Sequence, residues 1–198
     1  ALPISPSLKV LRFLGVSLGG GKTDRTSCAV VEYYPEQSKI FLRRLYHRLY
    51  STADESADLQ LHRIIDEYEK DLQSVALNVA LTFPKCLRCR LKCPGYEVCD
   101  EPEIKWMWKA HRRQAKHKRP NKLFTPYTER CAEIFLGNEM ETRFSAPHAL
   151  GSNSAPLMAR AQFIMRRLKH CKFIEFNPHV SVWRMGVDLG VNKTNLQL

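Results

Sequence analysis

The stretch "FLGVSLGGGKTDRTSCAVVEYY", residues 13–34, places a glycine-rich segment between two hydrophobic runs. Short runs of β-branched and aromatic residues bounded by glycine are typical of β-strands. A Walker A loop would need glycine at position 16, five residues before Gly21-Lys22-Thr23, but position 16 is Val16. The glycines at 19–21 are therefore interpreted as a hairpin turn, where glycine adopts positive φ without steric cost.

The flanking sequence extends this hairpin to three strands. The runs from Lys9 to Leu18, from Ser27 to Tyr34 and from Lys39 to Tyr46 are separated only by turn-forming residues. These runs predict an antiparallel meander.

A helix and a fourth strand follow the meander. Residues 51–73 have apolar side chains at helical spacing, with Ser51 or Thr52 as the expected N-cap. The segment "SVALNVALTF", residues 74–83, predicts a buried strand ended by Pro84. A crossover through the helix makes this strand parallel to the first one.

The rest of the chain supplies one more helix and one more strand. Residues 85–122 are rich in cysteine and then in cations, which indicates an insertion. A helix is expected after Pro156, and "KFIEFNP", residues 172–178, predicts the last strand. We therefore expect one α/β domain over residues 1–198, with a ribonuclease H-like mixed sheet flanked by helices and a Cys-rich basic insertion.

Composition favours a polyanionic partner. Lysine and arginine exceed aspartate and glutamate by 31 − 20 = 11, and the sequence pI is about 9.5. Such a balance favours nucleic acid. The sequence contains neither a basic leader followed by an apolar core nor an apolar run of about 20 residues, so we expect a soluble protein that does not bind membranes. Its seven cysteines, four of them close together, indicate a metal site or reduced thiols more than disulfides, so we expect it to be cytoplasmic.

Five motifs carry a resemblance to a known family. They are "GVSLGGGKT", "LTFPKCLRCRLKCPGYEVCDEPEIKWM", "FTPYTERCAEIF", "LGSNSAPLMARAQFIMRRL" and "IEFNPHVSVWRMG". With them the sequence resembles a bacterial domain-of-unknown-function family described as predicted nucleases of the ribonuclease H fold. The resemblance covers most of the chain. It implies cleavage of nucleic acid with Mg²⁺ or Mn²⁺, held by acids in the first strand, just before Leu-Thr-Phe-Pro, and before Asn-Pro.

Two of the three positions where the family is expected to carry acids are neutral here. They are Ser17 and Asn78, and only Glu175 is acidic. Because a divalent cation needs several anionic oxygens, the expected site is degenerate. The tail "GVDLGVNKT", residues 186–194, echoes residues 15–23 and makes Asp188 a candidate late acid. We expect a nuclease-like protein that acts on or binds nucleic acid. The alternative is a non-catalytic module that binds nucleic acid or protein; an actin-like relative would need a second, similar domain.

Four cysteines lie close together in the sequence. Cys86, Cys89, Cys93 and Cys99 have the spacing C-x2-C-x3-C-x5-C. Four thiolates can enclose a tetrahedral zinc, so a structural zinc site is predicted, with an iron–sulfur cluster or reduced thiols as alternatives. The other cysteines, at 28, 131 and 171, are expected to be small buried hydrophobes.

The basic stretch "KWMWKAHRRQAKHKRPNK", residues 105–122, contains no acid. Its eight cations can neutralise phosphates, and its tryptophans could stack on bases or anchor a helix to the core. The predicted nucleic-acid-binding residues are Lys105, Lys109, Arg112, Arg113, Lys116, Lys118, Arg119 and Lys122.

Two further motifs have no chemistry that the sequence alone reveals. "FTPYTER" contains Tyr127, Thr128 and Arg130, and "GSNSAP" places Asn153 just before a predicted helix, where it could cap the N-terminus. We include these four residues among the candidate site residues because they belong to the resembling motifs.

Overall fold

The computed structural model describes residues 9–20, 25–117, 124–139, 148–151 and 153–188. The chain divides into two compact units. The first unit combines Ala1–Val79 with Ala159–Leu198, and the second is Ala80–Met158. The predicted insertion at 85–122 lies within the second unit.

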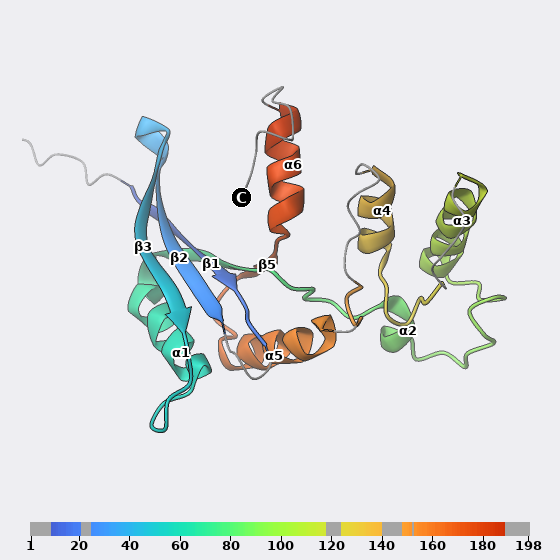
Figure 1. Ribbon diagram of the computed structural model, residues 1–198, viewed down its shortest axis with the longest axis horizontal. Coiled ribbons are helices and arrows are strands. Elements are labelled where there is room, and N and C mark those ends of the chain that lie inside the picture. The colour runs from blue at the N-terminus through green and yellow to red at the C-terminus, as the bar shows by residue number, and fades with distance from the viewer. Residues whose placement is uncertain (1–8, 21–24, 118–123, 140–147, 152, 189–198) are drawn as a thin grey trace, which may run out of the picture. The chain divides into compact units, whose positions relative to one another are not determined.

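The first unit contains a five-stranded mixed sheet with the strand order β3-β2-β1-β4-β5 (Figure 1). Strand β1 pairs antiparallel with β2 and parallel with β4; β2 pairs antiparallel with β3, and β4 pairs parallel with β5. The expected meander and the parallel fourth strand are confirmed, and the fold is α/β with a mixed sheet flanked by helices. The strands are β1 Leu11–Ser17, β2 Thr26–Tyr34, β3 Lys39–Leu49, β4 Leu72–Leu77 and β5 Phe173–Glu175.

Side-chain alternation places one face of this sheet in the core. Leu14 and Val16 of β1 lie beside Val75 and Leu77 of β4, and all four are buried. Because lateral neighbours in a sheet project to the same side, these residues define the buried face. Val30 of β2 continues that face beside Leu14.

Three longer helices belong wholly or partly to the first unit: α1 Ala57–Tyr68, α5 Ser154–Arg167 and α6 Pro178–Asp188, and the unit boundary falls inside α5. Short 3₁₀ turns occupy Pro35–Gln37 and Glu69–Asp71.

The predicted N-cap of α1 is wrong. Ser56 caps the helix, because its side-chain oxygen accepts a hydrogen bond from the backbone N–H of Leu59 at 3.1 Å. Ser51 instead accepts from the N–H of Ala57, and Thr52 closes a turn with Glu55.

Strand β4 begins and ends earlier than predicted. It runs from Leu72 to Leu77, and the chain bends at Asn78 well before Pro84. The reason lies in its partner, since β1 ends at Ser17 and offers no ladder beyond that level. The hydrophobic pattern of residues 79–83 therefore does not extend the sheet.

His62 is a buried polar residue in α1. It is 2% exposed, and neither ring nitrogen has a hydrogen-bond partner in the part of the chain that the structure describes. Burial lowers the pKa of His62, and the charge of Arg167 lowers it further, whereas Asp58 and Asp66 oppose the shift. The folded chain therefore favours the neutral imidazole.

This burial predicts a pH-dependent stability. The unfolded chain, with a histidine pKa of about 6.5, binds more protons than the folded chain just below that pH. The stabilising contribution is thus complete above about pH 6.5 and declines as the pH falls below it. In urea unfolding at pH 7.5 and 5.5, His62→Leu should lose less stability at the lower pH than the unmodified chain. His47→Gln, at an exposed position in β3, should behave as the unmodified chain.

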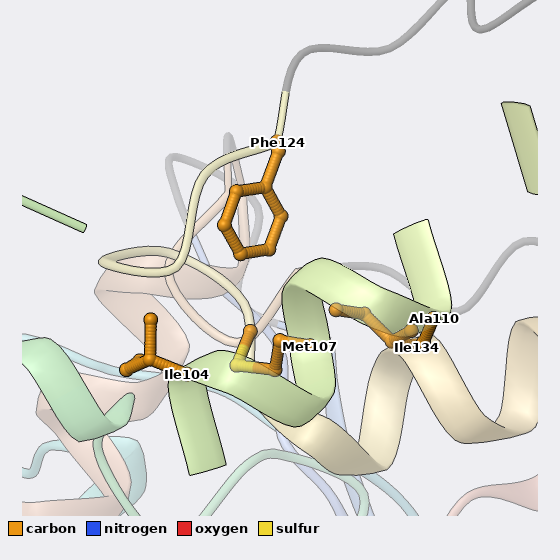
Figure 2. Close-up of a cluster of buried hydrophobic side chains, with 5 residues drawn as sticks. All are labelled: Ile104, Met107, Ala110, Phe124 and Ile134. Atoms are coloured by element: carbon orange, nitrogen blue, oxygen red, sulfur yellow. The ribbon is translucent and has the colours of Figure 1, made fainter. Parts of the chain in front are cut away.

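The second unit contains α2 Lys85–Arg88, α3 Pro102–His117 and α4 Cys131–Glu139. Its core is a cluster of five buried side chains, which Figure 2 shows between α3, α4 and the segment before α4. Three of these come from α3 at helical spacing, which is why this helix can bury one face and expose the other. The cluster consists of Ile104, Met107, Ala110, Phe124 and Ile134.

No helix within the described ranges combines the length and the apolar composition that crossing a membrane requires.

Candidate functional site

The carboxyl ends of β1 and β4 bring Ser17 and Asn78 together. The side-chain amide of Asn78 donates to Oγ of Ser17 at 3.0 Å, and its Oδ1 accepts from the backbone N–H of Leu18 at 2.9 Å. The backbone N–H of Asn78 also donates to the carbonyl of Val16. Two residues predicted to share a site are thus direct neighbours, although 61 positions separate them in the chain.

The glycine hairpin is fastened to the same end of the sheet. Arg160 of α5 donates to the carbonyl of Gly19 at 2.6 Å and to Oγ1 of Thr26 at 3.0 Å. Its Nε also pairs with Oδ1 of Asp58 in α1 at 2.7 Å. The N–H of Gly19 donates to Thr26. One guanidinium therefore connects α5, α1 and the hairpin base beside Ser17.

Glu175 lies at the same end of the strands as Ser17 but on the opposite face of the sheet. Val16, Leu77 and Glu175 are lateral neighbours across β1, β4 and β5. Side chains alternate along a strand, so Glu175 belongs to the face of Val16 and Leu77, whereas Ser17 belongs to the opposite face. The structure does not bring Glu175 onto the face shared by Ser17 and Asn78.

Asp188 is not part of this strand-end group. It is the last residue of α6, about 15 Å along the helix axis from Pro178, where that helix begins. Its carboxylate pairs with Arg184, one turn earlier, at 3.1 Å. Its role is therefore that of a surface ion pair within α6.

The strand-end donors do not fit a catalytic Mg²⁺ or Mn²⁺. Both polar atoms of the Asn78 amide are used in hydrogen bonds, one to Leu18 and one to Ser17. Within the described ranges, no three His, Cys, Asp or Glu side chains form a group able to hold a metal. A hard divalent cation needs several anionic oxygens, and this face presents neutral ones.

The "FTPYTER" motif builds a polar network in the second unit. Nε2 of His148 lies 2.8 Å from Oε1 of Glu129, and its Nδ1 lies 3.0 Å from Oγ1 of Thr128. Thr128 in turn bonds Oγ1 of Thr125 at 2.7 Å. The N–H of Leu150 donates to the carbonyl of Thr128. The network ties the turn before α4 to the turn at 148–151.

Arg130, the residue before α4, makes a buried ion pair. Its backbone N–H donates to Oε2 of Glu133 at 2.6 Å, while its Nε donates to Oε1 at 2.9 Å. A further N–H reaches Oγ1 of Thr82 at 3.0 Å. Glu133 thus occupies the helix position from which a glutamate caps the preceding N–H. The motif residue Arg130 is explained by folding, whereas Tyr127 and Asn153 are exposed.

The four clustered cysteines belong to the same region of the second unit. Cys86 and Cys99 pack against the buried cluster of Figure 2, and Cys93 is exposed. Burial raises the pKa of the Cys86 thiol, and the thiols of Cys99, Cys93 and Cys89 raise it further. The thiols are near one another, but in the described ranges they do not form a metal-binding group. Zinc binding by these four cysteines stays a prediction.

The other three cysteines differ in burial. Cys28 is buried in β2, and desolvation raises the pKa of its thiol to about 12, as expected for a small core residue. Cys131 and Cys171 are half-buried, and burial raises the pKa of Cys131 to about 11.

Helix α3 gathers four of the predicted nucleic-acid-binding cations on one surface. Together with Glu97 and Asp100 they line an open depression of about 760 Å³. Lys105 is neutralised by Asp100 at 2.6 Å, whereas Lys109 and Arg113 have no ion-pair partner among the described residues. We call the surface formed by Lys105, Lys109, Arg112 and Arg113 the basic face of α3.

The structure describes little of the four remaining predicted cations. Lys116 lies within α3, and nothing is described of its side chain. Lys118, Arg119 and Lys122 lie outside the described residues.

The two tryptophans of α3 have different roles. Trp108 stacks on Phe124, with ring centroids 4.7 Å apart, and also contacts Tyr96. It anchors the helix, and the guanidinium of Arg112 lies 4.9 Å from its ring centroid. Trp106 is 40% exposed and is the tryptophan of this helix that solvent reaches more freely.

Sequence reasoning missed Arg160, Asp58, Glu129 and His148. Arg160 lies 141 positions from Gly19 and 102 from Asp58, so no local window could have connected them. The pairing of Glu129 with His148 likewise spans segments that the sequence does not relate.

Comparison of the chain with protein-family models, with curated proteins and with solved structures finds no match.

Proposed function

We propose that this chain binds nucleic acid through the basic face of α3, without reading base sequence. The observation that carries the proposal is that Lys105, Lys109, Arg112 and Arg113 line one depression beside an anchored tryptophan. Cations gathered on one helix face can neutralise successive phosphates and release their counterions. The net charge of +11 adds long-range attraction for the same partner.

We further propose that the first unit is ribonuclease H-like and that its acidic site is degenerate. The strand order β3-β2-β1-β4-β5, with three antiparallel strands followed by two parallel ones, supports the first part. The hydrogen bond between Asn78 and Ser17, where paired acids are expected, supports the second. Nucleic-acid binding without cleavage is the function most compatible with both.

The binding site can be tested by removing three cations. Lys109→Ala, Arg112→Ala and Arg113→Ala together should weaken binding of a fluorescein-labelled 20-nucleotide single strand at least about tenfold at low salt. Loss of three phosphate contacts should also reduce the slope of log K against log salt by about 2. Fluorescence anisotropy between 50 and 300 mM KCl measures both quantities.

The matched control removes three exposed cations of the first unit: Lys70→Ala, Lys169→Ala and Lys172→Ala. This variant has the same net charge as the α3 variant and should retain most of the affinity. Equal weakening by both variants would contradict a localised site and leave only general electrostatic attraction.

The degenerate acidic site predicts that the unmodified chain does not cleave nucleic acid. Ser17→Asp with Asn78→Asp would place two carboxylates where the two side chains now meet at 3.0 Å. This variant should bind Mn²⁺ at least about tenfold more tightly than the unmodified chain, because anionic oxygens replace neutral ones. Isothermal titration measures the binding, and labelled DNA and RNA with Mg²⁺ or Mn²⁺ report any cleavage. Cleavage by the unmodified chain would overturn the non-catalytic proposal.

A second candidate function is a protein-interaction module. The observation that favours it is the partly buried network of Thr125, Thr128, Glu129 and His148, which rigidifies a turn beside exposed Tyr127. If the α3 variant and the unmodified chain show the same weak affinity for nucleic acid, this candidate replaces the first.

A further inference from the structure

Strand β3 is an exposed edge of the sheet in the first unit. It is a candidate binding surface separate from the basic face of α3. It is the outermost strand in the order β3-β2-β1-β4-β5 and extends over Lys39–Leu49 (Figure 1). An edge strand carries backbone N–H and C=O groups that can pair with one more strand. Its pairing with β2 is bulged between Leu42 and Arg44 and again between Tyr46 and Leu49. Bulges and cations both protect an edge from pairing, so the feature of β3 that needs an explanation is its exposed apolar side chains.

The apolar side chains of β3 are unusually exposed. Ile40 is 70%, Leu42 is 63% and Leu45 is 59% exposed. Their β2 neighbours are Tyr33, Val31 and Ala29 in that order, so the three side chains share one face of the sheet. A contiguous aliphatic row of this kind marks an interaction surface.

The opposite face of the same strand carries cations on either side of Phe41, which is 50% exposed and lies beside Glu32 of β2. Lys39 lies beside Tyr34, and Arg44 lies beside the buried Val30. Arg44 stacks over the Tyr46 ring at 5.1 Å, which holds its guanidinium near the strand. The strand "KIFLRRLYHRL" itself contains no acid that could pair with its cations.

We propose that the outer edge of β3 pairs with an extended acidic segment of a partner protein. Strand addition satisfies the edge backbone groups, and side-chain pockets on each face provide specificity. The partner would place apolar side chains beside Ile40, Leu42 and Leu45, and carboxylates beside Lys39 and Arg44. It therefore alternates acidic and apolar residues.

Two other occupants fit less well. A second copy that paired β3 with β3 around a two-fold axis would lay two strands side by side that each carry Lys39, Arg43 and Arg44 and no acid, which is unfavourable. Nucleic acid would satisfy the cations but leave the aliphatic row uncovered. Charge and apolar exposure together select an acidic polypeptide.

The probe is an 11-residue fluorescein-labelled peptide that alternates glutamate and valine. Anisotropy should show that it binds the full chain at least tenfold more tightly than three controls. The first has the same composition with all glutamates before all valines, the second replaces glutamate by lysine, and the third is N-methylated at alternate residues, which blocks strand pairing. Equal binding of the alternating peptide and the peptide with all glutamates before all valines would overturn the proposal, because charge alone would then explain the binding.

Variants of the protein localise the binding. Leu42→Thr with Leu45→Thr removes two of the three side chains of the aliphatic row but retains β-propensity, and Lys39→Glu with Arg44→Glu reverses the charges. Each pair should weaken peptide binding at least tenfold. Lys70→Glu with Lys169→Glu, a matched reversal at exposed positions outside β3, should leave it within twofold. Circular dichroism confirms that each variant is folded.

Three outcomes would overturn the proposal. The peptide could fail to bind, in which case the cations only protect the edge from aggregation. Binding of a 20-nucleotide strand, but not of the peptide, could depend on Lys39 and Arg44, which would assign β3 to nucleic acid. A dimer in light scattering that dissociates with Leu42→Thr and Leu45→Thr would assign the edge to a second copy. None of these outcomes depends on the basic face of α3.

Discussion

Replacing Arg130 by methionine is expected to lower the free energy of unfolding of the second unit by about 3–5 kcal/mol. Arg130 and Glu133 are 8% exposed each, and the guanidinium makes two hydrogen bonds to the Glu133 carboxylate. Removing the cation leaves a buried carboxylate without its charge partner, and the remaining hydrogen bond from the Arg130 backbone does not replace it. Hydrogen exchange of peptides covering α4, measured in increasing urea, reports this loss.

The control is the double variant Arg130→Met with Glu133→Leu. Replacing both members of a buried ion pair by apolar residues of similar volume is often close to neutral. The double variant should therefore recover most of the stability that the single variant loses. If both variants were destabilised equally, the loss would come from packing or from the contact with Thr82, and the charge argument would be wrong.

Gly19→Ala is expected to destabilise the first unit by about 1–3 kcal/mol, the usual cost of overpacking. A Cβ at this position would lie 2.5 Å from the backbone nitrogen of Arg25 and 2.8 Å from that of Thr26. These are backbone atoms, so a side-chain rotation cannot relieve the overlap. The hairpin base would have to open, which would strain the hydrogen bond that Gly19 donates to Thr26 and the one that it accepts from Arg160.

Gly15 supplies the matched control in the same strand region. A Cβ there would meet nothing within 4 Å, so Gly15→Ala should leave stability unchanged or slightly raised. Urea unfolding of both variants, with hydrogen exchange of residues 9–20, makes the comparison. Equal effects of the two substitutions would show that close backbone approach does not restrict position 19.

Much of the sheet could be predicted from local pattern. The strands β1 and β2 and helix α1 follow from the alternation or helical spacing of their own apolar residues, because each of them buries one face. Strand β3 follows only from its β-forming residues and the turns that bound it, because most of its side chains are exposed. The parallel pairing of β4 with β1 follows from the crossover through α1. The exact ends could not be predicted in this way. Ser56, rather than Ser51 or Thr52, caps α1, since several hydroxyl residues compete there and only the final backbone path selects one.

The candidate sites also had one part that could be predicted from the sequence and one part that could not. The cations of α3 could be predicted, because charge is a property of the residues, but only the structure shows that Lys105, Lys109 and Arg112 line one depression. The hydrogen-bond network of "FTPYTER" could not be predicted, because its partners His148 and Thr82 come from other segments of the chain.

The sequence by itself determined that there are five strands and the helices α1 and α5, the strong positive charge, and the neutral residues Ser17 and Asn78. Those properties depend on single residues or on short stretches of sequence. Only the tertiary structure decided that Asn78 bonds Ser17, that Arg160 fastens the glycine hairpin, and that Glu175 faces away from both. Such contacts join positions more than 60 residues apart, and they depend on strand register, which changes the face of every side chain when it shifts by one residue.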